Sequence, residues 1–344
     1  MLFFRTIFFT ILGAASLTEA ASAQSAGDFY KGKTLQFVVR STPGSDYDSL
    51  SRLLARHMPH FVPGSPAAVV VNMPGAGGMR AANFLANIAP KDGTALSIVG
   101  QGLPANQGLG QAEGLRADLR EFNWIGNVTS INQLLIVWHT SPVRKIDEIK
   151  TRRTVIGSQG GGSISLQIPA ALNNLLGMKF DIVTGYQGLS EMLLALERGE
   201  VEAIAATTAN SLRSSNPTWL IENKVIVLAQ IGGKRSREFP DAPLIHELAD
   251  KADDRSALEY ISKGVSVGRP LSTTPGVSKE RVAALRNAFN ATVIDSGFLA
   301  EAKRQSLEIE PTDWESLKAL VDGLIDSPKS LLEKVNAAID FKGK

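Results

Sequence analysis

The chain has 344 residues, which at roughly 150 residues per domain corresponds to about two domains. Its 36 Lys and Arg against 34 Asp and Glu leave a net charge of +2, without the basic excess that marks a nucleic-acid-binding surface. The absence of cysteine excludes disulfides, thiolate nucleophiles and zinc sites with Cys ligands, and four histidines leave little room for a His-rich metal centre.

The first 23 residues predict a secretory signal peptide. Arg5 supplies a short positive segment, Ile7–Leu17 form an apolar run, and Ala21-Ser22-Ala23 is an A-x-A cleavage site. The apolar run is shorter than the ~20 residues that a membrane-spanning helix needs, so we expect cleavage after Ala23 rather than anchoring. The mature protein is therefore expected to be exported and soluble.

The first part of the mature chain alternates predicted strands and helices. Strands are predicted at Thr34–Arg40, Ala68–Asn72 and Thr94–Val99, and helices at Leu50–Met58 and Ala81–Ile88. Turns rich in Gly and Pro separate these elements. Repeated strand–turn–helix units predict a doubly wound α/β sheet.

A long β-rich stretch, Trp124–Trp138, follows and is long enough to cross between two lobes. Beyond it, a second strand–turn–helix set is predicted, with strands at Thr154–Gly157, Phe180–Val183 and Val201–Ala205. The strand Val225–Gln230 is expected to lead back into the first lobe, and the tail from Ser278 onward is expected to be helical.

Four turns of small residues each leave a predicted strand and feed a helix N-terminus. They are Pro43-Gly44-Ser45-Asp46-Tyr47-Asp48, Pro74-Gly75-Ala76-Gly77-Gly78, Ser158-Gln159-Gly160-Gly161-Gly162-Ser163 and Tyr186-Gln187-Gly188. Glycine lets the backbone approach a ligand, and the unpaired N–H groups and positive dipole end of a helix suit a carboxylate. Any one of these turns is explained by chain reversal alone, but four in two successive lobes favour an anion-binding cleft.

The motifs of nucleotide-binding proteins and hydrolases are missing. Ser158–Ser163 lacks the Lys of a P-loop, and neither a complete G-x-G-x-x-G after a strand nor a G-x-S-x-G elbow occurs. His57 and His60, with Pro59 between them, are typical of a solvated helix end rather than of a metal pair. The sequence therefore predicts no cofactor, no metal and no catalytic residue, and the scattered basic groups predict no nucleic-acid partner.

Several short motifs also occur in a fixed order along the mature chain. They are Pro43–Asp48 with Arg52, N-x-P-G-A-G-G at Asn72–Gly78, P-x-D-G-x-x-L at Pro90–Leu96, Ser158–Ser163, Y-x-G at Tyr186–Gly188, G-x-V-x-A at Gly199–Ala203, Phe239–Pro243 with Glu247, and Pro275–Ser278. In this order they resemble the substrate-binding receptors of tripartite tricarboxylate transporters, the Bug-type extracytoplasmic solute receptors. The resemblance covers essentially the whole mature chain.

The resemblance implies an α/β type II periplasmic-binding-protein fold, in which crossover strands join two doubly wound lobes around a ligand cleft. On this basis residues 1–23 are the signal peptide, 24–128 and 236–344 form lobe I, and 129–235 form lobe II. It further implies a monomeric periplasmic receptor that closes on a small carboxylate and delivers it to membrane permease subunits.

The family's cleft-lining segments give the predicted ligand-binding set. It comprises Pro43, Gly44, Ser45, Asp46, Asp48, Gly75, Ala76, Gly77, Gly78, Gln101, Ser158, Gly160, Gly161, Gly162, Ser163, Tyr186, Gln187 and Gly188. The sequence departs from the family's first loop at Ser45, where a Gly is usual, and at Asp46, which adds a carboxylate beside the expected anion site. Such a charge disfavours a dianion unless it caps the helix or pairs with a cation, for which Arg40 is the candidate.

Two other functions remain open at this stage. A periplasmic ligand sensor for a two-component kinase would carry the same cleft, and an exported hydrolase could use Ser, His and Asp residues scattered along the chain. The ligand itself stays open as well, because a monocarboxylate, an amino acid or an aromatic acid fits the turns as well as a tricarboxylate does.

Overall fold

The computed structural model describes residues 26–160 and 163–341. The predicted signal peptide and two predicted ligand-binding residues, Gly161 and Gly162, lie outside the described residues. Within the described ranges, none of the helices has the length and apolar character needed to cross a membrane.

The first lobe is built on a five-stranded sheet with the order β2-β1-β3-β10-β4. Its strands are β1 (Thr34–Val39), β2 (Ala67–Asn72), β3 (Ala95–Ile98), β4 (Asn123–Asn127) and β10 (Pro270–Thr273). Strand β1 runs parallel to β2 and β3, whereas β10 is antiparallel to β3 and β4. The strands predicted for this part of the chain lie within two residues of those observed.

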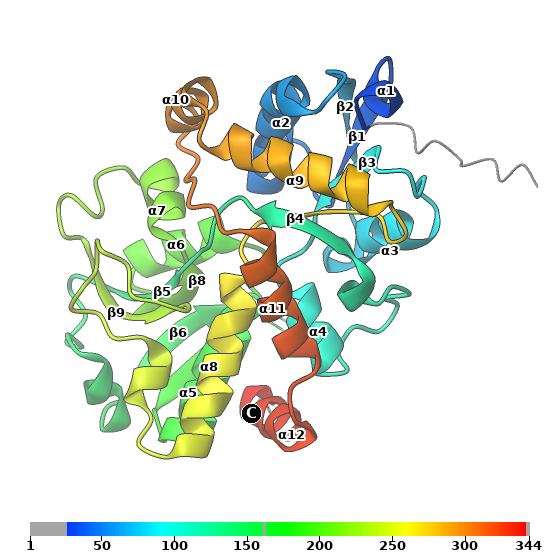
Figure 1. Ribbon diagram of the computed structural model, residues 1–344. Coiled ribbons are helices and arrows are strands. Elements are labelled where there is room, and N and C mark those ends of the chain that lie inside the picture. The colour runs from blue at the N-terminus through cyan, green and yellow to red at the C-terminus, as the bar shows by residue number, and fades with distance from the viewer. Residues whose placement is uncertain (1–25, 161–162, 342–344) are drawn as a thin grey trace, which may run out of the picture.

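Helices cover both faces of this first sheet (Figure 1). They are α1 (Ala26–Tyr30), α2 (Asp46–His57), α3 (Met79–Asn87), α4 (Leu103–Gly108), α9 (Lys279–Val293), α10 (Ser296–Arg304) and α11 (Trp314–Ile325), with 3₁₀ turns η1 (Met58–Phe61), η2 (Ala76–Gly78) and η3 (Leu119–Glu121). Buried side chains of α1, α2, α9 and α10 form one core with β1, and those of α3, α4 and α11 join a second core on the opposite face.

The second lobe holds another five-stranded sheet, with the order β7-β6-β8-β5-β9. Its elements are β5 (Gln133–Trp138), η4 (Ile146–Lys150), β6 (Thr154–Ser158), α5 (Ile164–Leu176), β7 (Phe180–Thr184), α6 (Leu189–Glu197), β8 (Ala203–Thr207), α7 (Ala209–Ser215) and β9 (Val225–Ile231). Side chains of α6 and α7 pack on one face of the sheet, and those of α5 pack on the other. The predicted α/β fold of two lobes is therefore confirmed.

The predicted crossing at Trp124–Trp138 is correct in place, but it is not one continuous strand. β4 pairs with β10 in the first sheet and β5 pairs with β8 and β9 in the second. The residues between β4 and β5 hydrogen-bond to the segment before β10. Val128 donates its N–H to the carbonyl of Arg269 at 3.0 Å, and the carbonyl of Thr129 accepts from the N–H of Arg269 at 3.0 Å. The two crossover segments thus hydrogen-bond to each other.

The chain does not return to the first lobe directly from the strand predicted at Val225–Gln230. β9 pairs with β5, and η5 (Ile245–Leu248) and helix α8 (Ala252–Ser266) follow before β10 begins. The boundary predicted at 128/129 lies between β4 and β5. The boundary predicted at 235/236 assigns α8 to lobe I, although α8 also packs against α5 of the second lobe. This boundary therefore stays a prediction.

The predicted division places the C-terminal helix α12 (Lys329–Ile339) in lobe I, whereas its contacts run to the second lobe and to α8. Helix α12 packs against α5 of the second lobe, where Asn174 donates hydrogen bonds to the carbonyls of Ala338 and Asp340. The cause is its apolar stripe, because Val335, Ala338 and Ile339 are buried in a core that runs continuously through α5, α8, α11 and both sheets. Figure 1 shows α12 below α11, near the lower end of α8 in this view.

Candidate ligand-binding site

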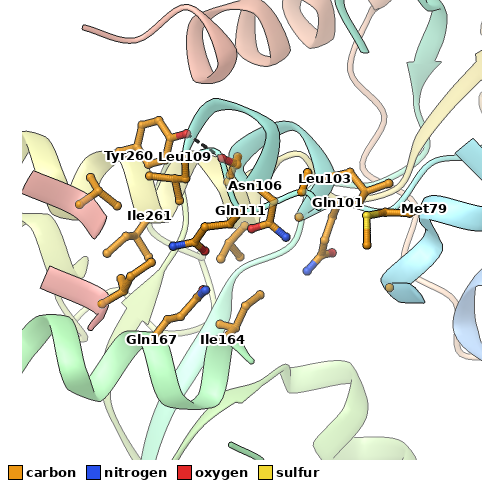
Figure 2. A pocket seen from close by; sticks show the side chains of 18 of the residues that line it. Met79, Gln101, Leu103, Asn106, Leu109, Gln111, Ile164, Gln167, Tyr260 and Ile261 are labelled. Carbon is orange, nitrogen blue, oxygen red and sulfur yellow. Dashed lines mark hydrogen bonds between the residues drawn. The ribbon is translucent and has the colours of Figure 1, made fainter. Parts of the chain in front are cut away.

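Two cavities lie between the lobes, and both are lined by Arg269. The first, named here the α4–α5 cavity, has a volume of about 640 Å³. It is bounded by the turn before α3 and the segment around α4 in the first lobe, by α5 in the second, and by α8 and α12 (Figure 2). The second, named the crossover cavity, has about 890 Å³ and is lined by the 129–134 crossover and the segments 206–213 and 233–239.

Two arginines and a tyrosine form the charged end of the α4–α5 cavity. The guanidinium carbons of Arg40 and Arg269 lie 4.4 and 4.3 Å from the centre of the Tyr47 ring. Arg40 Nη2 donates to the carbonyl of Gly77 at 2.7 Å, and Arg269 Nη1 donates to Oε1 of Gln101 at 2.6 Å. Cations over an aromatic face are stabilised by its quadrupole, so Tyr47 holds both positive groups beside the cavity.

Arg269 is held in the interior by the packing of the crossovers. Its N–H also lies 2.9 Å from Oδ1 of Asn127, and Gly268 adopts a φ of +66°. A Cβ at Gly268 would lie 2.1 Å from the carbonyl oxygen of Thr129, so only glycine lets the two segments approach this closely. Consequently the Arg269 residue is only 9% exposed.

Each of the two guanidinium groups contains one buried nitrogen that is unpaired within the described part of the chain. Nε of Arg40 and Nε of Arg269 are both buried and have no hydrogen-bond partner among the described residues. The two groups place two positive charges at one end of the cavity, where charge-assisted hydrogen bonds from their other nitrogens to an anion would offset their desolvation cost. This end of the cavity is therefore electrostatically suited to a carboxylate.

The partner of Asp46 differs from the one expected. The carboxylate of Asp46 lies 3.5 Å from Nη2 of Arg269, and its side chain is 63% exposed. Arg40, the candidate from the sequence, instead bonds Gly77 and stacks on Tyr47. The expectation was wrong because it considered only neighbours in the sequence, whereas β10 places Arg269 in contact with the first loop.

Asp48 stabilises the first loop from inside the lobe and lines neither cavity. Its carboxylate accepts hydrogen bonds from Gly44 N–H, Arg52 Nε and Asn72 Nδ2, each at 2.9 Å. Burial alone would raise the pKa of this carboxyl, but the hydrogen bonds from Arg52, Gly44 and Asn72 outweigh it and lower the pKa to about 2. Ser45 caps helix α2 by accepting from the N–H of Asp48.

The turn before α3 has an unusual backbone. Gly75, Ala76, Gly77 and Gly78 all have positive φ values, and Ala76 and Gly77 line the α4–α5 cavity. A Cβ at Gly78 would come within 2.5 Å of Nε of Arg40. Glycine at this position thus makes room for the guanidinium group of Arg40.

The described residues of the Gly-rich loop in the second lobe hydrogen-bond to one another and to the start of α5. The hydroxyl of Ser165 accepts from the N–H of Gln159 at 3.1 Å and lies 2.9 Å from Oγ of Ser163, while Gly160 N–H donates to Oγ of Ser158. Ser163 caps α5 through the N–H of Leu166. This loop supplies hydroxyls and backbone groups but no charge.

The Y-x-G turn is likewise satisfied by its own helix. Gln187 N–H donates to the carboxylate of Glu191 at 2.6 Å, and Tyr186 lies against Gly157, where a Cβ would be 3.2 Å from its ring. In both this turn and the first loop, an acidic side chain occupies a backbone N–H that the sequence argument had assigned to a ligand.

The structure therefore brings together only part of the predicted set. Ala76, Gly77 and Gln101 line the α4–α5 cavity, and Asp46 lines the crossover cavity. The other described members line neither cavity: Pro43, Gly44, Ser45, Asp48, Gly75, Gly78, Ser158, Gly160, Ser163, Tyr186, Gln187 and Gly188. Their contact with a ligand stays a prediction.

The sequence did not point to Tyr47 and Arg269, which form the charged end of the α4–α5 cavity together with Arg40. Tyr47 lies inside the motif Pro43–Asp48, of which every other residue entered the predicted ligand-binding set. An aromatic residue next to this turn could have indicated the site. Arg269 belongs to no motif, and it carries no signal in the sequence beyond being a charged residue directly before the short strand β10. Among the described residues, no group of three or more His, Cys, Asp and Glu could hold a metal ion.

Comparison with known proteins places the chain in a family. Residues 54–334 match the family described as "Tripartite tricarboxylate transporter family receptor", and the chain belongs to this family. A curated protein from the gbd 5′ region of Cupriavidus necator is 28% identical over 71% of this chain and 74% of its own length. BugT of Bordetella pertussis is 25% identical over the same shares, 71% and 74%. The resemblance inferred from the motifs is thus confirmed.

Solved structures share the fold. A TctC solute-binding protein from Polaromonas superposes with a TM-score of 0.68 at 20% identity, covering 89% of this chain and 99% of its own. MatC from Rhodopseudomonas palustris with bound malate gives 0.61 at 22% identity over 88% and 99%. A second R. palustris protein, with adipate, gives 0.60 at 20% identity over 88% and 97%. The two-lobe architecture is that of the periplasmic binding proteins.

Proposed function

We propose that this member of the tripartite tricarboxylate transporter receptors binds a small organic acid between its lobes and delivers it to membrane permease subunits. The observation that carries the proposal is the pair of guanidinium groups, Arg40 and Arg269, that Tyr47 holds at one end of the α4–α5 cavity. The bound malate and adipate of two structural neighbours support a carboxylate as the ligand.

Binding rather than catalysis is the role that the cavity lining supports. The described residues that line the α4–α5 cavity include no Ser, Thr, His, Asp or Glu, which are the side chains that hydrolases use as nucleophile, base or acid. A buried guanidinium recognises the planar carboxylate through two parallel hydrogen bonds. These features favour a receptor over the exported hydrolase.

Closure of the lobes would bring the predicted residues of the second lobe to the ligand. Ser158 and Thr184 end β6 and β7, so the described residues that follow them, 159–160 and 185–188, lie at the carboxyl edge of the second sheet, where ligands of α/β proteins bind. A hinge at the crossovers 128–132 and 266–270 is compatible with this movement, because the chain changes lobes there. We propose that Ser163 and Tyr186 act after closure.

Thermal unfolding with a panel of carboxylic acids tests the binding. Because a ligand that binds only the folded state stabilises it by about 2.7 kcal/mol at 100 times its Kd, a receptor ligand should raise the Tm by several degrees. The matched control for each acid is its methyl ester, which keeps the body but removes the charge. If no acid at millimolar concentration raises the Tm above its ester, carboxylate binding is refuted.

Delivery and location need separate measurements. Cells that lack the gene should lose uptake of the radiolabelled acid, and complementation with a chain lacking residues 1–23 should fail to restore it because that chain is not exported. Small-angle scattering should show a smaller radius of gyration with the acid bound. Undiminished uptake in the deletion strain would instead favour the sensor function.

A further inference from the structure

We propose that the α4–α5 cavity selects acids with a single carboxylate and an apolar body, such as a medium-chain or aromatic monocarboxylate. This inference rests on the proposed function and names its ligand class. The carboxylate lies at Arg269 and the body extends between α4, α5 and α8.

The charge of the site matches one carboxylate. Arg40 and Arg269 carry two positive charges, Asp46 offsets one of them at 3.5 Å from Arg269, and Nη2 of Arg40 is already bonded to Gly77. No other described residue lining the α4–α5 cavity is charged. A second carboxylate on the ligand would therefore lie among uncharged groups without a cation to offset its desolvation.

The remainder of the cavity is predominantly apolar. Aliphatic and aromatic side chains reach it from five helices of the fold: Met79, Leu103, Leu109, Ile164, Tyr260, Ile261, Val265, Val335 and Ile339. The Tyr260 hydroxyl lies 3.0 and 3.1 Å from the carbonyls of Ala105 and Leu324, so this residue offers its ring rather than a free hydroxyl. Figure 2 shows Leu103 and Leu109 above the cavity, Ile164 below it on α5, and Ile261 at its side next to Tyr260 on α8.

Apart from the arginines and the two tyrosines, the polar side chains that line the cavity are amides. Gln101 is occupied by Arg269, and Gln111 donates to Oδ1 of Asn336 at 2.6 Å. Asn106 and Gln167 are left to face the cavity (Figure 2). Neutral amides can accommodate a carbonyl or hydroxyl on the body, but they offer no charge complementary to a second carboxylate.

A chain-length series separates this inference from the proposed function. Acetate, butyrate, hexanoate and octanoate keep one carboxylate, and each added methylene that is buried should raise affinity up to about fourfold. Succinate and adipate should bind more weakly than butyrate and hexanoate, which have the same numbers of carbons. If the diacids bind best, or affinity does not change with length, the inference is wrong while the receptor function stands. If no acid binds, both fail.

Variants of the apolar wall test the placement of the body. Ile261→Asn places an amide in the wall, and we expect it to lower the affinity for hexanoate about tenfold and to change that for acetate less than twofold. The matched control is Ile294→Asn, because Ile294 is 75% exposed and outside the cavity. An equal loss for both acids, or no loss for hexanoate, would overturn the placement.

The charge balance is tested at Asp46. Asp46→Asn removes the offsetting charge, so the affinity for adipate should rise about tenfold relative to hexanoate. Asp253→Asn, on the exposed first turn of α8, is the control for a lost surface charge. An unchanged adipate-to-hexanoate ratio in Asp46→Asn would refute the role of charge in selection.

Discussion

The two lobes present different chemistry to the space between them. The first lobe supplies the guanidinium groups of Arg40 and Arg269, held by Tyr47 and by the crossovers. The second presents Ile164 and Gln167 of α5, two uncharged side chains, next to a loop of serines and glycines that hydrogen-bond to one another. Two guanidinium groups of like charge stay close together only where the surrounding structure is rigid. The Gly-rich loop, by contrast, can exchange its internal hydrogen bonds for hydrogen bonds to a ligand. We infer that the first lobe recognises the acid and the second covers it.

The largest effect is expected at the charged end of the first lobe. Arg269→Gln should lower affinity for the preferred acid about 100-fold, because hydrogen bonds to charged groups contribute about 1.5–3 kcal/mol. Titration calorimetry measures the loss, and thermal unfolding of the variant shows whether it still folds. Arg304→Gln, an exposed change on α10, is the matched control. If Arg269→Gln folds and keeps its affinity for the acid, the first lobe does not recognise the acid through Arg269.

The next effect concerns the frame of the first lobe rather than its charge. Because the pKa of Asp48 is lowered to about 2, its ionised form stabilises the fold above the unfolded pKa near 4. This contribution, on the order of 2 kcal/mol, is lost as the pH falls through about 2. Asp48→Asn should therefore lower the free energy of unfolding at pH 7 by about that amount, and its difference from the parent should shrink toward pH 2.

Urea unfolding between pH 7 and pH 3 measures this pH dependence. Asp46→Asn, on the same first turn but 63% exposed, serves as the control and should change the free energy of unfolding by less than about 0.5 kcal/mol. A difference between Asp48→Asn and the parent that does not vary with pH would show that Asp48 acts by packing and not by charge.

The smallest effect is expected in the second lobe. Ser165→Ala removes a buried hydroxyl that organises the Gly-rich loop, which should lower the free energy of unfolding by about 1 kcal/mol. Affinity for the acid should change less than about fivefold, because the loop covers the ligand without supplying charge. A loss as large as that of Arg269→Gln would mean that the second lobe, too, recognises the acid.

Much of the local structure could be predicted from the sequence. The four turns do leave β1, β2, β6 and β7 and feed α2, α3, α5 and α6, because Gly, Pro and capping Ser residues determine where a strand ends and a helix begins. The crossing near residues 128–132 was also predictable, from a β-rich stretch long enough to cross between two lobes. Its division between two sheets was not, since that depends on which strands pair with it.

The anion site was predicted less well. The sequence argument assigned it to backbone N–H groups, but Asp48 and Glu191 occupy the N–H groups of Gly44 and Gln187. Whether an acidic residue in the first turn of a helix caps its own loop or faces a ligand depends on the side-chain rotamer and on burial, which local sequence does not determine.

The sequence by itself determined the family through the order of its motifs. It also determined the α/β pattern of two lobes and the turns at the edges of the sheets, because these are encoded in patterns of neighbouring residues. The tertiary structure alone decided the charged end of the cavity. Tyr47 and Arg269 are 222 residues apart in the chain. They meet only because β10 joins the first sheet and Gly268 lets the crossovers pack at backbone distance, so the position of this guanidinium is a property of the packing rather than of any local pattern.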